Sequence, residues 1–149
     1  MQNNKEIELI VNQAIKIARD KHQDYVLTEH VLLSLIRHEP FRKALEGFGT
    51  SVDLLDLELD SYLSGLISIA SKKKEVNPRK TNALERLFNR AMTQVLFTGR
   101  RAMTTYDLYL AMTSEHNSHA NYFLMKYGVK KQEFKDYWDA HYKYEEAEI

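Results

Sequence analysis

The sequence has no cysteine among its 149 residues, which excludes disulfide bonds and thiolate metal sites. Proline and glycine are scarce, with two and five copies, and strand-like alternation is nearly absent. No apolar run approaches the roughly 20 residues of a membrane span. The first residues lack the cationic and apolar regions of a signal peptide. We therefore expect a soluble, cytoplasmic protein built mainly of helices.

Neither sign of charge is in excess, because 21 lysine and arginine residues balance 21 aspartate and glutamate residues. Phosphate binding requires a basic surplus, so nucleic acid is not expected as the main partner. A chain of this length buries roughly 70% of its extended surface on folding. The composition therefore predicts a chain that needs no covalent cross-links and folds as one compact unit or two small halves.

Apolar residues recur at helical spacing along nearly the whole chain. They predict eight helices, centred on residues 4–21, 28–37, 41–48, 51–70, 84–95, 108–112, 122–125 and 134–141. The sequence thus predicts an all-α fold of about eight helices, followed by an acidic tail at 143–149.

The clearest interruption is SKKKEVNPRK, residues 71–80, in which five cations and one anion surround Pro78. Such a charge run with a proline predicts a linker. A solvated loop is a commoner use of this composition than anion binding. The linker separates a first part, 3–70, from a second part, 81–142.

The two parts repeat each other when the sequence is shifted by 77 positions. Core positions then coincide: Ile7 with Leu84, Ile10 with Leu87, Leu33 with Leu110 and Val52 with Val129. Each half alone has a thin core. We therefore predict two pseudo-symmetric four-helix halves that pack together as a single domain.

The stretch LTEHVLLSLI contains adjacent Glu29 and His30 directly before an apolar run. Such pairs occur in catalytic and metal sites, but the repeat places Tyr106 and Asp107 at the same positions. Both pairs lie in the first turn of a helix, where exposed N–H groups favour an acid. Thr104 is expected to cap the second of these helices together with Asp107. We interpret His30 as structural and leave Glu29 open as a helix-start acid or an exposed docking contact.

Other catalytic chemistry has little support. None of the five glycines belongs to a GxxxxGK[ST] phosphate loop, so this chain is not itself an ATPase. His116 and His119 lack a third ligand nearby and are interpreted as a solvated pair rather than a metal site. A hydrolase that uses Glu29 and His30 is the weakest hypothesis. The tyrosines near the C-terminus, with Trp138, are expected to cover the core.

The segment ELIVNQAIKIARDKHQDYVLTEHVLLSLI, together with the repeat, resembles the N-terminal domain of Clp-type AAA+ unfoldases. That family combines an acidic-aliphatic start, an Asn-x-Ala, an Ala-Arg and a Glu-His-aliphatic helix. The resemblance extends from residue 3 to about 142. It is greatest to the ClpA group, because the second half reads TTYDLYLAM instead of repeating a Thr-Glu-His motif.

The resemblance implies a docking domain that binds protein substrates through a ClpS-type adaptor. The adaptor brings N-degron substrates, which have destabilising N-terminal residues, to the unfoldase and its partner protease ClpP. No cofactor is implied for this chain, since ATP and Mg²⁺ would bind the ATPase modules of the parent unfoldase. An alternative is a free-standing helical regulator that binds the adaptor and sequesters it.

Carried over by position, the resemblance implies an adaptor-binding surface of Asp24, Glu29, Thr81 and Arg86. Three of these match in residue type, and Asp24 stands where the ClpA group usually has Glu. The family's capping Thr normally lies two residues before the Glu, where this chain has Leu27. The start of that helix is therefore expected to be built differently.

Overall fold

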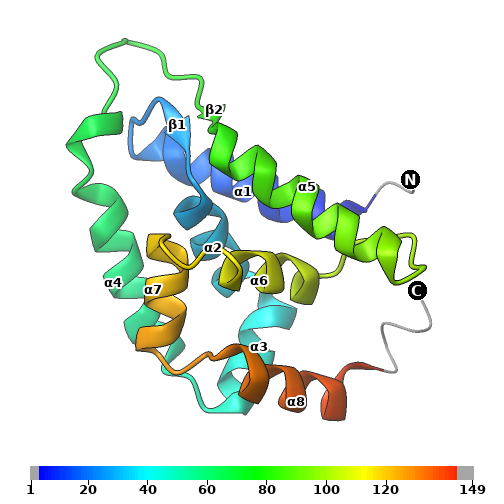
Figure 1. Cartoon of the computed structure of the whole chain (residues 1–149). Coiled ribbons are helices and arrows are strands. Elements are labelled where there is room, and N and C mark those ends of the chain that lie inside the picture. The colour runs from blue at the N-terminus through cyan, green and yellow to red at the C-terminus, as the bar shows by residue number, and fades with distance from the viewer. Residues whose placement is uncertain (1–3, 144–149) are drawn as a thin grey trace.

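A computed structural model describes residues 4–143, which form eight α-helices (Figure 1). The helices of the first half are α1 Lys5–Asp20, α2 Thr28–Arg37, α3 Glu39–Phe48 and α4 Val52–Ser64. Those of the second half are α5 Asn82–Phe97, α6 Thr105–Thr113, α7 His119–Lys126 and α8 Lys131–His141. The predicted all-α fold is thus confirmed, whereas the predicted acidic tail lies outside the described residues except for Lys143.

The helix boundaries follow the 77-residue repeat. Shifting the bounds of α1 by 77 positions gives 82–97, which are the bounds of α5. The same shift moves α2 to 105–114, and α6 spans 105–113. Asn4 and Thr81, which cap α1 and α5, each accept a hydrogen bond at 3.2 Å from the backbone N–H three residues on. The repeat seen in the sequence is therefore a repeat of helices and of their caps.

In each half, the N-cap residue of the first helix donates a hydrogen bond to a backbone carbonyl of the other half. The Thr81 backbone N–H donates to the Val26 carbonyl at 3.2 Å, and the Asn4 side-chain amide donates to the Met103 carbonyl. The 77-residue shift converts Asn4 into Thr81 and Val26 into Met103, so the two contacts are counterparts. Reciprocal contacts of this kind are typical of an interface between twofold-related units.

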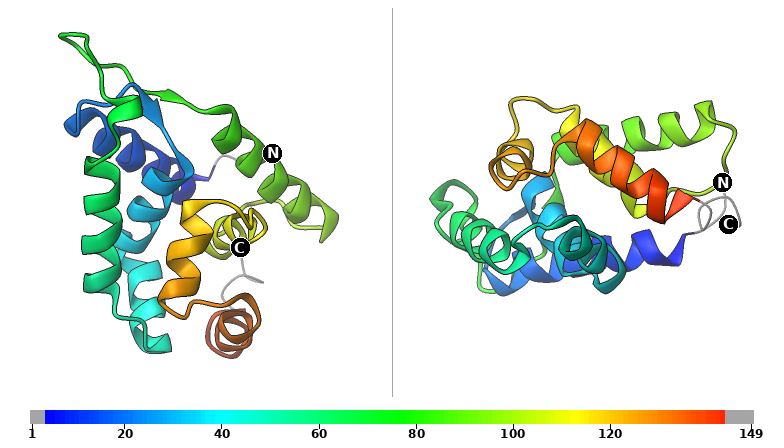
Figure 2. Two further views of the ribbon diagram at one scale, coloured as in Figure 1. Left: turned by 60° about the vertical axis from the view of Figure 1, so that its left-hand side comes forward. Right: turned by 90° about the horizontal axis from the view of Figure 1, so that it is seen from below.

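Helix α2 occupies the centre of the domain. Nine of its ten residues are buried, and it contacts α1 and α3 to α7. Figure 2 shows the loop after α4 at one end of the molecule and α8 at the other. The buried apolar side chains of both halves form one continuous cluster. No helix within residues 4–143 is long and apolar enough to cross a membrane.

Aromatic side chains of the C-terminal part, including Tyr137, Tyr142 and Trp138, pack on the core as expected, but Tyr122 is 55% exposed. Further rings pack between α6 and α8. The rings of Tyr106 and Trp138 stack with centroids 5.3 Å apart, and Tyr109 meets Phe134 at 4.9 Å. The Tyr109 hydroxyl donates to the Val129 carbonyl at 3.0 Å, and burial raises the pKa of this phenol. These rings extend the apolar core, and the Val129 carbonyl provides the acceptor that the buried Tyr109 hydroxyl requires.

The fourth helix ends earlier than predicted, at Ser64 rather than near Ala70. Gly65 follows it, and Ile67–Ile69 form a 3-10 turn, η1. The Ile69 carbonyl accepts a hydrogen bond from the Asp24 N–H at 2.8 Å. The chain after α4 therefore pairs with the segment before α2 and does not continue its own helix.

The structure also contains a short parallel ladder that the sequence analysis did not predict. Strand β1, Tyr25–Val26, pairs with β2, Arg79–Lys80, with Tyr25 opposite Arg79. The end of the predicted linker is thus fixed to the first half. The pairing has no local sequence signal, because β2 consists of two exposed cations.

Limited trypsin digestion is expected to cut first at Lys72, Lys73 or Lys74. These lysines are exposed in an irregular segment, whereas the helices that flank it are hydrogen-bonded and packed. Mass spectrometry of timed digests measures the first cleavage site. A variant with all three lysines replaced by serine should lose the early products. Earlier cleavage within 5–64 would contradict the two-half organisation.

Candidate functional site

The starts of α2 and α5 lie side by side because the strands that precede them are paired. Strand β1 leads through Leu27 into α2, and β2 leads through Thr81 into α5. The strands are parallel, so both helices begin at the same end of the ladder (Figure 1). The Arg79 N–H also donates to the Asp24 carbonyl at 2.9 Å. Segments more than 50 positions apart in the sequence therefore form one surface.

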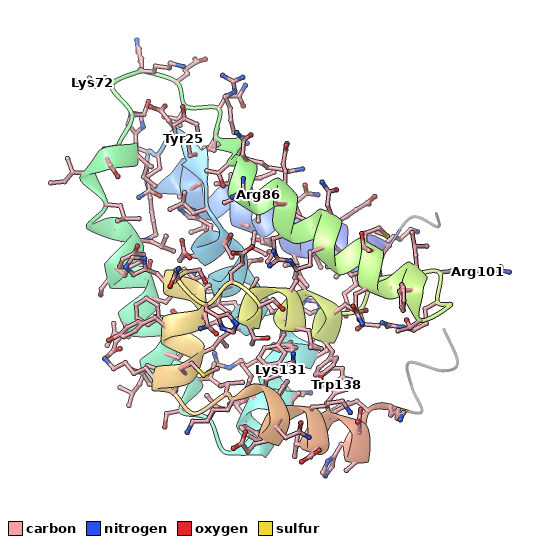
Figure 3. The ribbon with its side chains drawn as sticks, viewed as in Figure 1. Tyr25, Lys72, Arg86, Arg101, Lys131 and Trp138 are labelled. Atoms are coloured by element: carbon pink, nitrogen blue, oxygen red, sulfur yellow. The ribbon has the colours of Figure 1, made fainter. Side chains whose placement is uncertain are left out.

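Three of the four residues expected to bind an adaptor are accessible on this surface. Asp24 and Thr81 are half-buried, and Arg86 is exposed. The Thr81 hydroxyl oxygen accepts from the Leu84 N–H, so its own hydrogen is free to donate to a partner. Arg86 lies in the second turn of α5 (Figure 3). Neither Asp24 nor Arg86 forms an ion pair with another residue in the described part of the chain.

Glu29 is buried, which corrects the expectation of an exposed docking contact. Its side chain is 8% exposed, and its Oε2 accepts a hydrogen bond from the Ala120 N–H at 3.0 Å. Burial raises the pKa of the carboxyl, while the Ala120 N–H and the charge of His119 oppose this rise. The reason for the burial is that α7 packs over the start of α2. Glu29 supplies an acceptor to an N–H in the first turn of α7.

His30 is fully buried and structural, as predicted. Its Nδ1 accepts a hydrogen bond from the Leu27 N–H at 2.9 Å, so its Nε2–H donates to Gln23 Oε1 at 2.7 Å. Gln23 in turn donates to the Leu63 carbonyl at 2.7 Å. In a capping box, a side chain three residues after the N-cap accepts a hydrogen bond from the N-cap N–H. The His30 ring has this role for the N-cap residue Leu27. The helix start is built differently from the family pattern, as expected.

The burial and bonding of His30 also exclude the hydrolase hypothesis. Burial lowers the pKa of His30 to about 4, so the ring is neutral at pH 7. Both ring nitrogens are engaged, and Glu29 bonds to α7 instead of to the ring. No ring nitrogen is left to take a proton from a substrate.

The predicted capping pair of the second half is confirmed. The Asp107 N–H donates to the Thr104 hydroxyl oxygen at 3.3 Å, and the Thr104 N–H donates to Asp107 Oδ2 at 2.8 Å. Arg100 donates to both carboxylate oxygens of Asp107, at 2.8 and 2.6 Å. The sequence did not indicate this arginine, which compensates the charge of a buried acid.

Sequence reasoning missed an aromatic hollow of about 370 Å³ between α4 and α7. Tyr62 stacks on His119 with centroids 4.7 Å apart, and Phe123 packs against Tyr62 at 5.6 Å. His116 and His119 are exposed, and residues 4–143 contain no group of three side chains suited to a metal. Tyr62 lies 57 positions before His119, so no local pattern could have revealed the hollow.

Comparisons with known proteins support the sequence resemblance. The profile of the family described as "Clp repeat (R) N-terminal domain" matches residues 3–127. A "ClpA homolog protein" of Fuscovulum blasticum is 29% identical over 126 residues, covering 80% of this chain and 15% of that protein. The chain therefore spans about 15% of the length of this relative.

Two solved structures share the fold. The Hsp104 N-terminal domain from Candida albicans superimposes with a TM-score of 0.75 and 13% identity, covering 93% of this chain and 90% of that one. A chain from structural work on a malarial protein secretion system gives a TM-score of 0.77 with 10% identity, covering 95% and 98%. At these identities, the likeness concerns the fold alone.

The buried His30 is expected to make folding stability sensitive to acid. Between pH 6.5 and about 4 the unfolded chain protonates this histidine while the folded chain keeps it neutral. Its contribution to the free energy of unfolding is therefore complete above pH 6.5 and is lost as the pH falls to about 4. The loss is on the order of 3 kcal/mol. Urea unfolding across this pH range measures it.

The matched control for this measurement is His30→Asn, which keeps an acceptor for the Leu27 N–H but does not titrate. Its free energy of unfolding should fall less on acidification. The raised pKa of Glu29 acts in the opposite direction, adding stability as the pH falls from that pKa to 4.5, and it is present in both proteins. Equal acid sensitivity of the two proteins would contradict the assignment.

Glu29→Lys is expected to destabilise the fold, because it places an unpaired cation against a buried N–H group. The expected loss in the free energy of unfolding is about 3–5 kcal/mol. Glu29→Gln keeps the acceptor for Ala120 and should cost less than about 1.5 kcal/mol. Chemical unfolding of both variants is the measurement, and parental stability of Glu29→Lys would show that this carboxylate is not buried in solution.

Proposed function

Because the chain belongs to the Clp repeat N-terminal domain family, we propose that it is the docking domain of a ClpA-like AAA+ unfoldase. In this role it binds a ClpS-type adaptor and so receives N-degron substrates. The parent protein's other modules carry ATP hydrolysis and the contact with ClpP. The main support is the pairing of β1 with β2, which gathers Asp24, Thr81 and Arg86 at two adjacent helix starts.

The chemistry of this surface suits reversible binding to a folded protein. Arg86 offers five N–H donors, Asp24 offers carboxylate acceptors, and Thr81 offers one hydroxyl hydrogen. Both charged side chains are free of ion pairs within residues 4–143, so a partner does not have to break an existing pair. A surface that carries both signs also discriminates between partners, because a misplaced like charge costs several kcal/mol.

Glu29 contributes to this proposed surface indirectly. Its hydrogen bond to Ala120 fixes α2 against α7, and α2 follows directly from β1. Loss of the bond would therefore act through the position of the helix start and through stability. The adaptor itself contacts the accessible residues Asp24, Thr81 and Arg86.

The alternative of a free-standing regulator uses the same surface, because it also binds the adaptor. The two proposals differ in whether the same polypeptide carries an ATPase module. A phosphate-binding GxxxxGK[ST] loop further along the reading frame supports the unfoldase, and a stop codon before any such loop supports the regulator.

Arg86→Ala and Asp24→Lys are each expected to weaken the binding of a ClpS-type adaptor. Loss of a desolvated charged contact at an interface costs on the order of 1–3 kcal/mol, whereas substitution of an exposed side chain such as that of Arg86 changes stability by less than about 0.5 kcal/mol. Calorimetric titration and melting curves measure the two quantities. His116→Ala, an exposed change in the second half, should alter neither.

Two results would contradict the proposal in different ways. Parental affinity of both Arg86→Ala and Asp24→Lys would place the adaptor elsewhere on the domain. The absence of any binding by the parent domain to a ClpS-type adaptor would reject adaptor docking itself.

A further inference from the structure

The loop between the halves concentrates positive charge. We call residues 71–80 the basic loop. It contains Lys72, Lys73, Lys74, Arg79 and Lys80, all exposed, and one acid, Glu75. None of the five cations forms an ion pair with another residue between positions 4 and 143. The loop projects from one end of the molecule (Figure 2), and its five cations are exposed to solvent.

The basic loop is anchored at both ends. The Ser71 N–H donates to the His22 carbonyl at 2.9 Å, and His22 Nε2–H donates to the Lys73 carbonyl at 2.7 Å. At the other end, the Arg79 N–H donates to the backbone carbonyl of Asp24, directly before β1. A loop that is positioned before binding loses less conformational entropy when a partner arrives.

His22 holds an uncommon backbone conformation to make these bonds. Its φ is +58°, and it is the only residue other than glycine with a positive φ within residues 4–143. Histidine is among the residues that adopt this region more readily than most. In this conformation both the carbonyl and the ring of His22 bond to the basic loop. His22 thus fixes the backbone of the loop at Ser71 and Lys73.

Exposed apolar side chains adjoin the cations. Tyr25 is 44% exposed and lies opposite Arg79 in the ladder, so the two side chains are neighbours. Ile67 is 88% exposed in the turn that leads to the loop. Tyrosine and arginine are both enriched at protein interfaces relative to the rest of the surface.

We propose that the basic loop binds an acidic segment of a partner protein, a run of aspartate and glutamate side chains. The exposed apolar side chains beside the loop favour this partner over nucleic acid or an anionic membrane, because a protein segment carries apolar side chains that can contact Tyr25 and Ile67. The loop carries five cations and one anion, a net charge of +4, whereas the other residues between positions 4 and 143 carry 16 cations and 17 anions, a net charge of −1. The positive charge available to an acidic segment is therefore concentrated in the basic loop. This binding site goes beyond adaptor docking and does not depend on it.

The test is fluorescence anisotropy with a labelled oligoglutamate peptide. The loop variant Lys72→Ser/Lys73→Ser/Lys74→Ser is compared with Arg101→Ser/Lys130→Ser/Lys131→Ser, which removes three exposed cations from other parts of the chain. Figure 3 shows Arg101 and Lys131 away from Lys72. Both variants lower the net charge equally. The loop variant should bind the peptide about five- to tenfold more weakly, and the difference should shrink when salt is raised from about 50 to about 300 mM.

Melting curves confirm that both variants fold. Arg86→Ala should bind the peptide as tightly as the parent, because Arg86 lies outside the basic loop. The two proposals are therefore tested separately, and a negative result for adaptor docking does not contradict binding of the acidic peptide. Equal weakening by the two triple variants overturns the proposal, because binding would then follow net charge alone. Tighter loop-dependent binding of an oligothymidine or of phosphatidylglycerol vesicles than of oligoglutamate also overturns it, in favour of a phosphate ligand.

Discussion

The burial of α2 on all sides is the constraint on which the rest of the domain depends. The first N–H groups of a helix have no partners within the helix, and water cannot reach them when the helix lies in the core. His30 provides the acceptor for the Leu27 N–H, and Gln23 completes the network by bonding to α4. Glu29 serves α7 in the same way. An unpaired buried polar group costs more than the bond would have contributed, so folding alone explains why these two titratable residues are present.

Much of the fold could be predicted because its pattern is local and repeated. The spacing of apolar residues predicted the helices, the 77-residue shift predicted their repetition, and the pairing of Thr104 with Asp107 predicted a helix cap. The burial of Glu29 could not be predicted, since its partner Ala120 lies 91 positions away. The β1–β2 ladder could not be predicted for the same reason. Arg79 and Lys80 have the composition of a linker, and their partners Tyr25 and Val26 lie 54 positions earlier in the sequence. Pairing between distant segments thus accounts for the main differences at the candidate site.

Two neighbouring surfaces of unlike electrostatic character result from that ladder. Around the helix starts, a carboxylate, a hydroxyl and a guanidinium offer short-range, directional contacts. The basic loop, which ends in β2, offers several charges of one sign. Directional contacts determine which partner fits, whereas clustered charge acts mainly on the rate of encounter. A neutral domain therefore combines specificity and attraction at one end without a large net charge.

The reciprocal contacts, Thr81 to Val26 and Asn4 to Met103, join the halves at their helix starts, in addition to the shared apolar core and the β1–β2 ladder. The entropy of closing a loop rises only slowly with its length, by about 0.6 kcal/mol for each doubling. The stretch between the anchored residues Lys73 and Arg79 can therefore change its length or its charge at little cost to folding. Substitutions in this stretch would change the charge at one end of the domain while the paired helix starts stay in place.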